Sequence, residues 1–214
     1  RVSIIDYGAG NVQSLEFALN RLGVSGILTS NKEIIMDSDK VIFPGVGEAS
    51  TAMRKLKSTG LDKVIPNLKQ PFLGICLGMQ LLCNSSEEGN TKGLNIFSCN
   101  VKRFTTKRKV PQMGWNIIKN LKGPLFKKIQ ISYVYLVHSY YVPIIRPTIS
   151  VTDYGLEYST AIQTDNFFER GWYAASVVIL FANTIDILYI SVFIIIDIIQ
   201  IFTKNFLKVV YNSC

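Results

Sequence analysis

Histidine, paired cysteines and charged residues are all scarce in this 214-residue chain. It has one histidine and four cysteines, and no two of the cysteines form a Cys-x-x-Cys pair. Zinc sites draw their ligands from such sets, so we expect no metal centre. The glycines at positions 8 and 10 lack the third glycine of a dinucleotide-binding loop, because Gln13 stands in its place. We therefore expect no cofactor.

Charge is sparse but unevenly placed. Only 18% of residues are charged and 48% are hydrophobic, which excludes a chain that is disordered throughout. The net charge is +8, and basic residues crowd into 102–128. No nucleic-acid-binding motif accompanies them, so we expect a solvated or protein-docking face and no nucleic-acid partner. No signal peptide precedes the first expected strand, and unpaired thiols suit a reducing compartment, so we expect a cytoplasmic protein.

The first half of the chain alternates between strand and helix patterns. Apolar runs at 2–6, 27–29, 40–43 and 71–75 are typical of buried strands, and glycine-rich turns follow three of them. Between the first two, Leu15, Ala18, Leu19 and Leu22 recur at helical spacing before Gly23. This alternation predicts a parallel sheet with helices on both faces. Ligands of such sheets lie at the carboxyl ends of the strands, where the glycine-rich turns fall.

The pattern changes near residue 95 to shorter runs of β-branched and aromatic residues. These runs predict antiparallel strands at 96–97, 101–104, 115–118 and 133–137 that extend the same sheet. A further hairpin is expected from 151–155 and 158–162.

A candidate nucleophile stands at Cys76, between Gly74 and Gly78, where an apolar run gives way to a helix-compatible segment. This order is typical of a nucleophile elbow, in which a strand turns sharply into a helix. The flanking glycines remove side chains that would collide with the strand or the helix. The helix N-terminus favours a thiolate over a thiol. The alternative is a buried cysteine at a strand end, because free cysteine is among the most buried residue types.

Six motifs occur in a fixed order: D-Y-G-A-G-N at 6–11, P-G-V-G at 44–47, G-I-C-L-G-M-Q at 74–80, S-E-E-G at 86–89, V-P-Q-M-G-W-N at 110–116 and V-H-S-Y-Y at 137–141. With D-Y-G at 153–155 and D-N-F-F at 165–168, they resemble the glutaminase subunit of imidazole glycerol phosphate synthase. That family is a class I, triad-type glutamine amidotransferase of histidine biosynthesis. The resemblance covers residues 2–168. It implies a flavodoxin-like α/β fold with a mixed, mostly parallel sheet, helices on both faces and an aberrant C-terminal part.

The resemblance also implies a reaction and its residues. Glutamine would be hydrolysed through a cysteinyl thioester, and ammonia would pass to a (β/α)8 cyclase partner in a heterodimer. By resemblance Cys76 is the nucleophile, and the oxyanion hole is built from backbone N–H groups of Gly45, Val46, Gly47 and Leu77. The residues around the glutamine would be Gln80, Glu88, Ser139 and Tyr140. The cyclase partner would be faced by Asn11, Met113 and Trp115; without the family, Trp115 reads as an ordinary core aromatic.

The general base is missing from its expected place. In the family it lies in a late Phe-His-Pro-Glu segment, soon after a motif like that at 165–168. Here residues 169–173 read E-R-G-W-Y, and no His-Pro-Glu occurs anywhere. The one histidine, His138, is expected to line the glutamine site and not to replace the base. A nucleophile without its base and proton donor loses several orders of magnitude in rate, so we expect little or no glutaminase activity.

Residues 1–168 are expected to form the amidotransferase domain, and residues 169–214 a divergent, isoleucine-rich tail. A shifted reading frame would explain the abrupt change in composition, and we favour it. A transmembrane helix over about 176–202 is long enough, but its two aspartates make insertion costly. The third explanation is a divergent segment that completes the fold.

Three other functions compete with a glutaminase subunit of the synthase. One is a pseudoenzyme that binds glutamine or the cyclase, and another is a membrane-anchored protein. The third is a different amidotransferase, such as the glutaminase of a pyridoxal phosphate synthase, and the motif at 110–116 argues against it.

Overall fold

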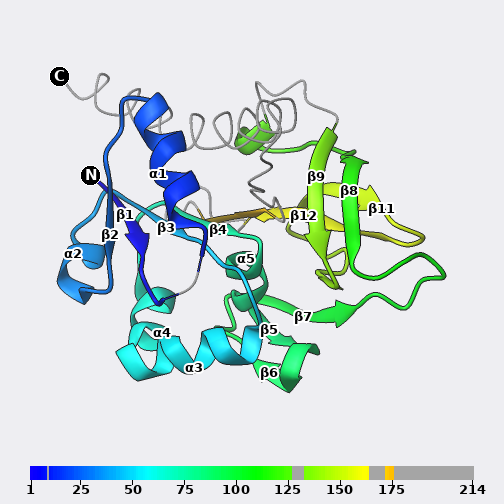
Figure 1. Ribbon diagram of the computed structural model, residues 1–214, viewed down its shortest axis with the longest axis horizontal. Coiled ribbons are helices and arrows are strands. Elements are labelled where there is room, and N and C mark those ends of the chain that lie inside the picture. Colours follow the sequence, from blue (N-terminus) through cyan, green and yellow to red (C-terminus); the bar gives the residue numbers. More distant parts are fainter. Residues whose placement is uncertain (9, 127–132, 164–171, 176–214) are drawn as a thin grey trace.

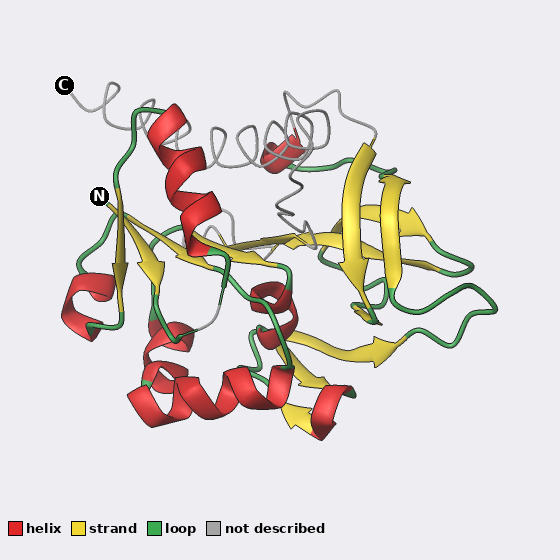
Figure 2. Ribbon diagram, in the orientation of Figure 1, coloured by secondary structure: helices red, strands yellow, loops and turns green. Residues whose placement is uncertain are grey.

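The described residues build one large mixed sheet and two smaller ones (Figure 2). This computed structural model describes residues 1–8, 10–126, 133–163 and 172–175. The large sheet has the strand order β11-β12-β13-β4-β3-β1-β2 (Figure 1). Its parallel strands are β1 (Val2–Ile5), β2 (Gly26–Thr29), β3 (Lys40–Phe43), β4 (Phe72–Ile75) and β13 (Trp172–Ala175). The antiparallel strands are β12 (Glu157–Gln163) and β11 (Thr148–Asp153).

Helices cover both faces of this sheet, as the sequence predicts. Every residue of β1, β3 and β4 is buried, because their apolar runs supply side chains to both faces. Ile4 packs with Leu15 and Leu19 on one face, whereas Ile5 packs with Leu56 on the other. The helices are α1 (Val12–Arg21) on the first face and, on the second, α2 (Lys32–Met36), α3 (Ala49–Thr59), α4 (Leu61–Val64) and α5 (Leu77–Leu81). Short 3₁₀ turns lie at η1 (Ile65–Asn67), η2 (Glu88–Asn90) and η3 (Pro124–Phe126).

The strands between α5 and β11 do not extend the large sheet, which corrects the prediction. One small sheet consists of β10 (Tyr140–Tyr141), β7 (Phe97–Arg103), β5 (Cys83–Ser86) and β6 (Thr91–Lys92). The other is the hairpin of β8 (Gln112–Ile117) and β9 (Tyr133–His138). The reason is that β3 and β13 already flank β4, so the chain leaving α5 meets no free strand edge there. The predicted pairing of β11 with β12 is confirmed.

Strand β13 comes from the segment expected to be a separate tail. It lies between β4 and β12 and pairs with both, so residues 172–175 complete the large sheet. The domain boundary at 168 and the three explanations for residues 169–214 stay predictions. No helix among residues 1–8, 10–126, 133–163 and 172–175 is long and apolar enough to cross a membrane. The predicted span at 176–202 lies outside the described residues.

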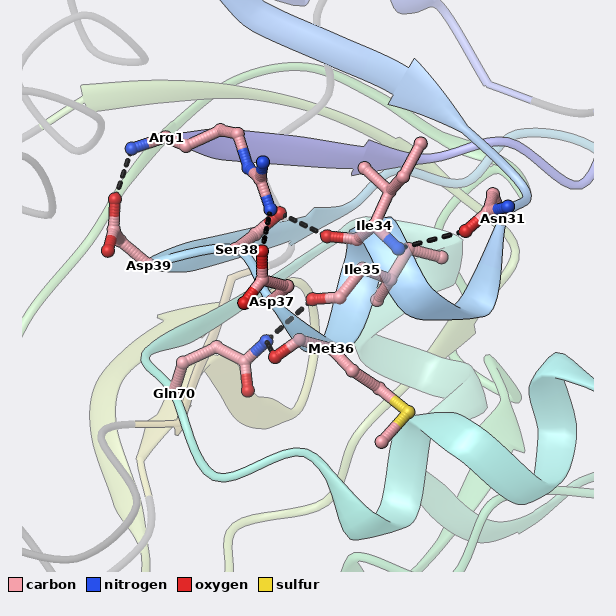
Figure 3. Close-up of polar contacts among 9 residues, drawn as sticks. All are labelled: Arg1, Asn31, Ile34, Ile35, Met36, Asp37, Ser38, Asp39 and Gln70. Carbon is pink, nitrogen blue, oxygen red and sulfur yellow. Dashed lines mark hydrogen bonds and ion pairs between the residues drawn. The ribbon is translucent and has the colours of Figure 1, made fainter.

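Polar contacts around α2 fix the start of β3 (Figure 3). The Asn31 side chain caps α2 by accepting from the Ile34 N–H at 2.9 Å, and the Ser38 hydroxyl donates to the Ile34 carbonyl at 2.6 Å. Gln70, which precedes β4, donates through Nε2 to the Ile35 carbonyl at 2.8 Å. These contacts tie the entries of β3 and β4 together, so the turns at their carboxyl ends start from a fixed register.

Candidate active site

Cys76 occupies the sharp turn between β4 and α5. Its backbone has φ 54° and ψ −115°, a conformation that a residue with a side chain rarely adopts. Such a backbone costs about 1–3 kcal/mol and persists where the surrounding structure enforces it. The strand, the strained turn and the helix that follows are the predicted nucleophile elbow.

Glycines let the elbow touch the turn that follows β3. A Cβ on Gly78 would lie 2.1 Å from the Phe43 carbonyl oxygen, and a Cβ on Gly45 would lie 2.4 Å from the Gly78 nitrogen. Real side chains do not fit at these distances, so both positions require glycine. The P-G-V-G turn at 44–47 is thereby held backbone-to-backbone against the start of α5. Gly47 has φ 91° with open space around it, and Val46 is exposed.

Burial of the Cys76 thiol acts against the thiolate that the helix N-terminus is expected to favour. Burial raises the pKa of the Cys76 thiol to about 11, a hydrogen bond from the Leu77 N–H lowers it in part, and the negative charge of Glu88 raises it further. Helix α5 has only five residues, and desolvation outweighs what its N-terminus contributes. Some surface of Cys76 remains accessible to solvent.

Glu88 brings a carboxylate to the same place. Its Oε2 accepts from the Ala49 N–H at 2.9 Å, at the first turn of α3, and burial raises the pKa of the Glu88 carboxyl above its usual value. The charge of Glu88 also contributes to the raised pKa of the Cys76 thiol. The hydrogen bond to Ala49 thus attaches the S-E-E-G motif to the first turn of α3.

Gln80 joins α5 to the segment around Tyr140. Gln80 is buried, and its Nε2 donates to the Tyr140 carbonyl at 3.1 Å. The Ser139 carbonyl accepts from the Phe104 N–H at 3.0 Å, so this segment is fixed at its backbone. Gln80 also connects to the elbow itself, because its N–H donates to the Cys76 carbonyl at 3.2 Å. We call residues 138–141 the Tyr140 segment.

The candidate partner residues lie on two separate surfaces. Met113 and Trp115 lie on the outer face of the β8–β9 hairpin, with 63% and 37% of their surfaces exposed. Trp115 pairs with Tyr135, ring centroids 5.3 Å apart, so it is not a core residue. Asn11 begins α1 next to Gly10, whose Cβ position lies 3.1 Å from the Pro44 side chain. Asn11 therefore lies beside the P-G-V-G turn.

The family model "Glutamine amidotransferase class-I" matches residues 3–167, close to the range that the motifs cover.

The chain belongs to the class-I glutamine amidotransferase family.

Curated relatives place it on a branch of that family. It is 53% identical over 172 residues to the imidazole glycerol phosphate synthase subunit HisH of Bacteroides fragilis (strain YCH46), covering 78% of this chain and 88% of that protein. It is 44% identical over 170 residues to HisH of Haemophilus influenzae (strain ATCC 51907 / DSM 11121 / KW20 / Rd), covering 78% and 85%. The predicted resemblance to the glutaminase subunit of this synthase is confirmed.

Solved structures confirm the fold class of this amidotransferase. A putative GMP synthase protein from Thermoplasma acidophilum superimposes with a TM-score of 0.64 at 18% identity, covering 94% of this chain and 92% of that one. A crystal structure of a glutamine amidotransferase gives a TM-score of 0.62 at 16% identity, covering 83% and 89%. At these identities the likeness concerns the fold alone.

Tyr7 contacts the turn that follows β3, and the sequence reasoning did not single it out. Its hydroxyl donates to the Pro44 carbonyl at 2.9 Å, so it holds the turn that carries Gly45. Burial raises the pKa of the Tyr7 phenol, and the charge of Cys76 raises it further. The signal was available, because Tyr7 lies within the D-Y-G-A-G-N motif and follows β1, the strand next to β3.

His138 is buried and neutral. Its Nδ1 lies 2.8 Å from the Tyr140 carbonyl oxygen, and its Nε2 lies 3.3 Å from the Tyr158 hydroxyl. Burial lowers the pKa of the His138 imidazole to about 4. Both nitrogens of this one histidine ring thus face partners other than Cys76. Among the described parts of the chain, no three His, Cys, Asp or Glu residues cluster as metal ligands.

The pairing of β13 with β4 shows which residues of β13 lie level with the Cys76 elbow. A catalytic base on this strand would have to lie at that level. β13 runs parallel to β4, with Ala174 opposite Gly74 and Ala175 opposite Ile75. The carboxyl end of β13 therefore reaches the level of the elbow, later in the sequence than the predicted position at 169–173. Ala174 and Ala175 at this level carry neither imidazole nor carboxylate, and the sequence continues with S-V-V at 176–178.

Proposed function

We propose that this amidotransferase is the glutaminase subunit of an imidazole glycerol phosphate synthase of histidine biosynthesis. Glutamine binds at the Cys76 site, and a (β/α)8 cyclase binds as the heterodimer partner. The observation that carries the proposal is the strained Cys76 elbow packed against the turn that contains Gly45. The relatives named HisH support the choice of synthase.

The chemistry follows from the groups at the elbow. The Cys76 sulfur attacks the side-chain amide carbon of glutamine, and the C–N bond breaks to give a thioester and ammonia. Water then cleaves the thioester to glutamate. The negative oxygen of each tetrahedral intermediate is stabilised by N–H groups at the elbow and the facing turn, each typically worth about 3–4 kcal/mol of barrier. Those donors are the backbone N–H groups of Gly45, Val46, Gly47 and Leu77.

Glutamine recognition is assigned to the two sides of the site. The half-buried Glu88 carboxylate pairs with the substrate ammonium, because a hydrogen bond between two charged groups is stronger than one between neutral groups. Gln80, Ser139 and Tyr140 line the opposite side. The contact of Gln80 with the Tyr140 carbonyl and the action of the Glu88 charge on Cys76 support this arrangement.

The cyclase is assigned to the outer face of the β8–β9 hairpin and the start of α1. Met113 and Trp115 expose apolar and aromatic surface there, which is the composition of interface centres. Asn11 lies beside the P-G-V-G turn, close to where ammonia is released. Retention of this chain by a HisH-associated cyclase, measured by titration calorimetry, tests the assignment.

Turnover is expected to be very low, because the sequence contains no His-Pro-Glu and both nitrogens of its one histidine face partners other than Cys76. The test is an ammonia-release assay on two chains in the presence of the cyclase: the protein as it is, and the triple variant S176H/V177P/V178E. The variant places His-Pro-Glu just after β13. We expect its rate to exceed the starting rate by a factor of 100 or more, since general acid–base catalysis contributes about 10²–10⁴-fold. A starting chain that turns over at about 10 s⁻¹, an ordinary kcat, would contradict the proposal of low turnover.

A second function is favoured by two observations: the thiol pKa of about 11 and the engagement of both His138 nitrogens. In that case the chain is a non-catalytic subunit that binds glutamine or the cyclase. If the unaltered protein and the variant S176H/V177P/V178E both bind the cyclase but release no ammonia, the result would favour the non-catalytic subunit over the glutaminase.

A further inference from the structure

A line of buried polar groups joins the β8–β9 hairpin to the Tyr140 segment. Gln112 Oε1 lies 2.8 Å from the Tyr158 hydroxyl, and that hydroxyl lies 3.3 Å from His138 Nε2. His138 Nδ1 lies 2.8 Å from the Tyr140 carbonyl oxygen, which also accepts from Gln80 Nε2 at 3.1 Å. The side chains of these polar groups, Gln112, Tyr158, His138 and Gln80, are all buried. Their hydrogen bonds to one another therefore replace hydrogen bonds to water.

The Tyr140 carbonyl, at one end of this line of polar groups, determines which atoms of His138 and Tyr158 carry the protons. A carbonyl oxygen only accepts, so His138 must carry its proton on Nδ1 to bond with Tyr140. His138 is neutral, because its imidazole pKa is about 4. Its Nε2 is therefore an acceptor, and the hydroxyl of Tyr158 is the donor that faces it. Tyr158 must thus give its single proton to His138.

The same reasoning orients Gln112. With its proton on the His138 side, the Tyr158 oxygen can only accept from Gln112, which requires the amide NH₂ and not Oε1 to face it. Half a turn of the amide exchanges the two groups, and the alternatives differ only in their hydrogen bonds. Gln112 Nε2 as placed is buried and has no partner among the described residues; the turn pairs this donor with Tyr158 and moves Oε1 to the unpaired position.

We propose that Tyr158 is a positioning residue for the glutamine-binding wall. Its hydroxyl fixes the tautomer and orientation of His138, which in turn holds the Tyr140 carbonyl in place together with Gln80. The backbone of Ser139 and Tyr140 is thereby presented to the substrate in one conformation. The inference rests on the proposed function, since it assumes that this segment binds glutamine.

Ring packing and hydroxyl chemistry are separable at Tyr158. Its ring packs edge-on against Phe104, centroids 5.3 Å apart, and Phe104 stacks on His138 at 5.4 Å. Replacing Tyr158 by phenylalanine keeps these ring contacts and removes only the hydroxyl, with its contacts to His138 and Gln112. Tyr154 offers a matched control, because it packs edge-on against the same Phe104 at 5.7 Å while its hydroxyl donates elsewhere, to the Lys109 carbonyl at 2.8 Å.

The first experiment measures how fast Cys76 is alkylated in the full chain and in the variants Tyr158→Phe and Tyr154→Phe. The probes are a chloroketone shaped like glutamine and iodoacetamide. With the chloroketone, a sulfur–carbon bond forms, chloride leaves and the thiol proton passes to solvent. The readout is the ratio of the two rates, because only the chloroketone uses the glutamine-binding wall. We expect Tyr158→Phe to lower this ratio about tenfold, the upper end for one hydrogen bond, with iodoacetamide unchanged. We expect Tyr154→Phe to leave it unchanged.

The second experiment uses the fact that the chain has one histidine. Nitrogen-15 NMR of histidine-labelled protein then reports the His138 tautomer without ambiguity. We expect Nδ1–H in the starting protein and a mixture of tautomers in Tyr158→Phe. This measurement on the starting protein decides the proton order even if a variant fails to fold.

The outcomes separate the role of Tyr158 from the proposed function. A starting protein that shows no preference for the chloroketone over iodoacetamide contradicts the proposed function. A preference that survives in Tyr158→Phe, an equal loss in Tyr154→Phe, or an Nε2–H tautomer in the starting protein overturns the role of Tyr158 alone.

Discussion

The two sides of the candidate site are held in different ways. On the Cys76 side, backbone lies directly against backbone, because Gly45 and Gly78 have no side chains to separate the turn from the elbow. On the Tyr140 side, the backbone is held at a distance by the side chains of Gln80 and His138. At Gly45 and Gly78 even one added side-chain carbon would clash with the backbone opposite. On the Tyr140 side, a substitution of Gln80 or His138 would remove one hydrogen bond and leave the other in place. The two sides should therefore respond differently to substitution.

Gly78→Ala should have the largest effect. The added methyl would lie 2.1 Å from the Phe43 carbonyl oxygen, so the elbow and the turn must separate. We expect a loss of stability above the about 1–3 kcal/mol of ordinary overpacking, measured by urea unfolding. Gly47→Ala is the control: its site is open and only the positive φ is strained, so about 1–2 kcal/mol is expected. Equal losses in the two variants would show that close packing does not distinguish the elbow.

The Tyr140 side should respond to pH instead. Burial lowers the folded-state pKa of His138 from 6.5 to about 4, so below pH 6.5 the unfolded chain takes up a proton that the folded chain refuses. Stability is therefore complete above pH 6.5 and falls as the pH drops towards 4, by up to about 3 kcal/mol. Unfolding of the starting protein and of His138→Gln should be compared at pH 7 and pH 4.5. The same pH dependence in both would place its origin in other groups.

The outer face of the hairpin should contribute to docking and not to folding. Trp115→Ala should change unfolding stability by less than about 0.5 kcal/mol, as is usual for exposed sites. If the face binds the cyclase, the same change should weaken binding by about 2 kcal/mol, or about thirtyfold, as for aromatic anchors. Met36→Ala serves as the control, because Met36 is 63% exposed on α2, across the molecule from β8 (Figure 1). Equal effects of both variants on cyclase binding would argue against a hairpin interface.

The smallest expected effect concerns the charge beside the thiol. With a Cys76 pKa of about 11, alkylation by iodoacetamide should accelerate about tenfold per pH unit from pH 7 to pH 10, because the thiolate reacts. Glu88→Gln removes the charge that raises this pKa, so labelling at pH 8 should become a few times faster. Glu87→Gln is the matched control, since Glu87 accepts from the Arg103 N–H at 2.7 Å and is not among the groups that shift Cys76. A plateau in rate below pH 9 would contradict the raised pKa.

The elbow side was predictable from sequence, and the Tyr140 side was not. Gly74, Cys76 and Gly78 lie within five positions, and spacing alone indicates a strand that turns into a helix. The line from Gln112 through Tyr158 to His138 joins three strands that are distant in sequence, and only their packing reveals it. The raised thiol pKa was also missed, because sequence shows the helix N-terminus but not the depth of burial.

The same limit applies to the strands. Periodicity located β8 and β9, but it could not show that β3 and β13 leave no edge of β4 free for them. Nor could composition show that residues 172–175, from an apolar segment unlike the family, enter the centre of the large sheet. Pairing is a property of the whole topology, and no local pattern contains it.

The alternation along β8 has one more consequence. Gln112 points inward to Tyr158, and its neighbour Met113 points outward to solvent. Successive side chains of an extended strand point to opposite faces. A molecule bound to the outside of the hairpin would therefore contact the residue next in sequence to Gln112, the first member of the buried polar line whose other end is the segment proposed to bind glutamine.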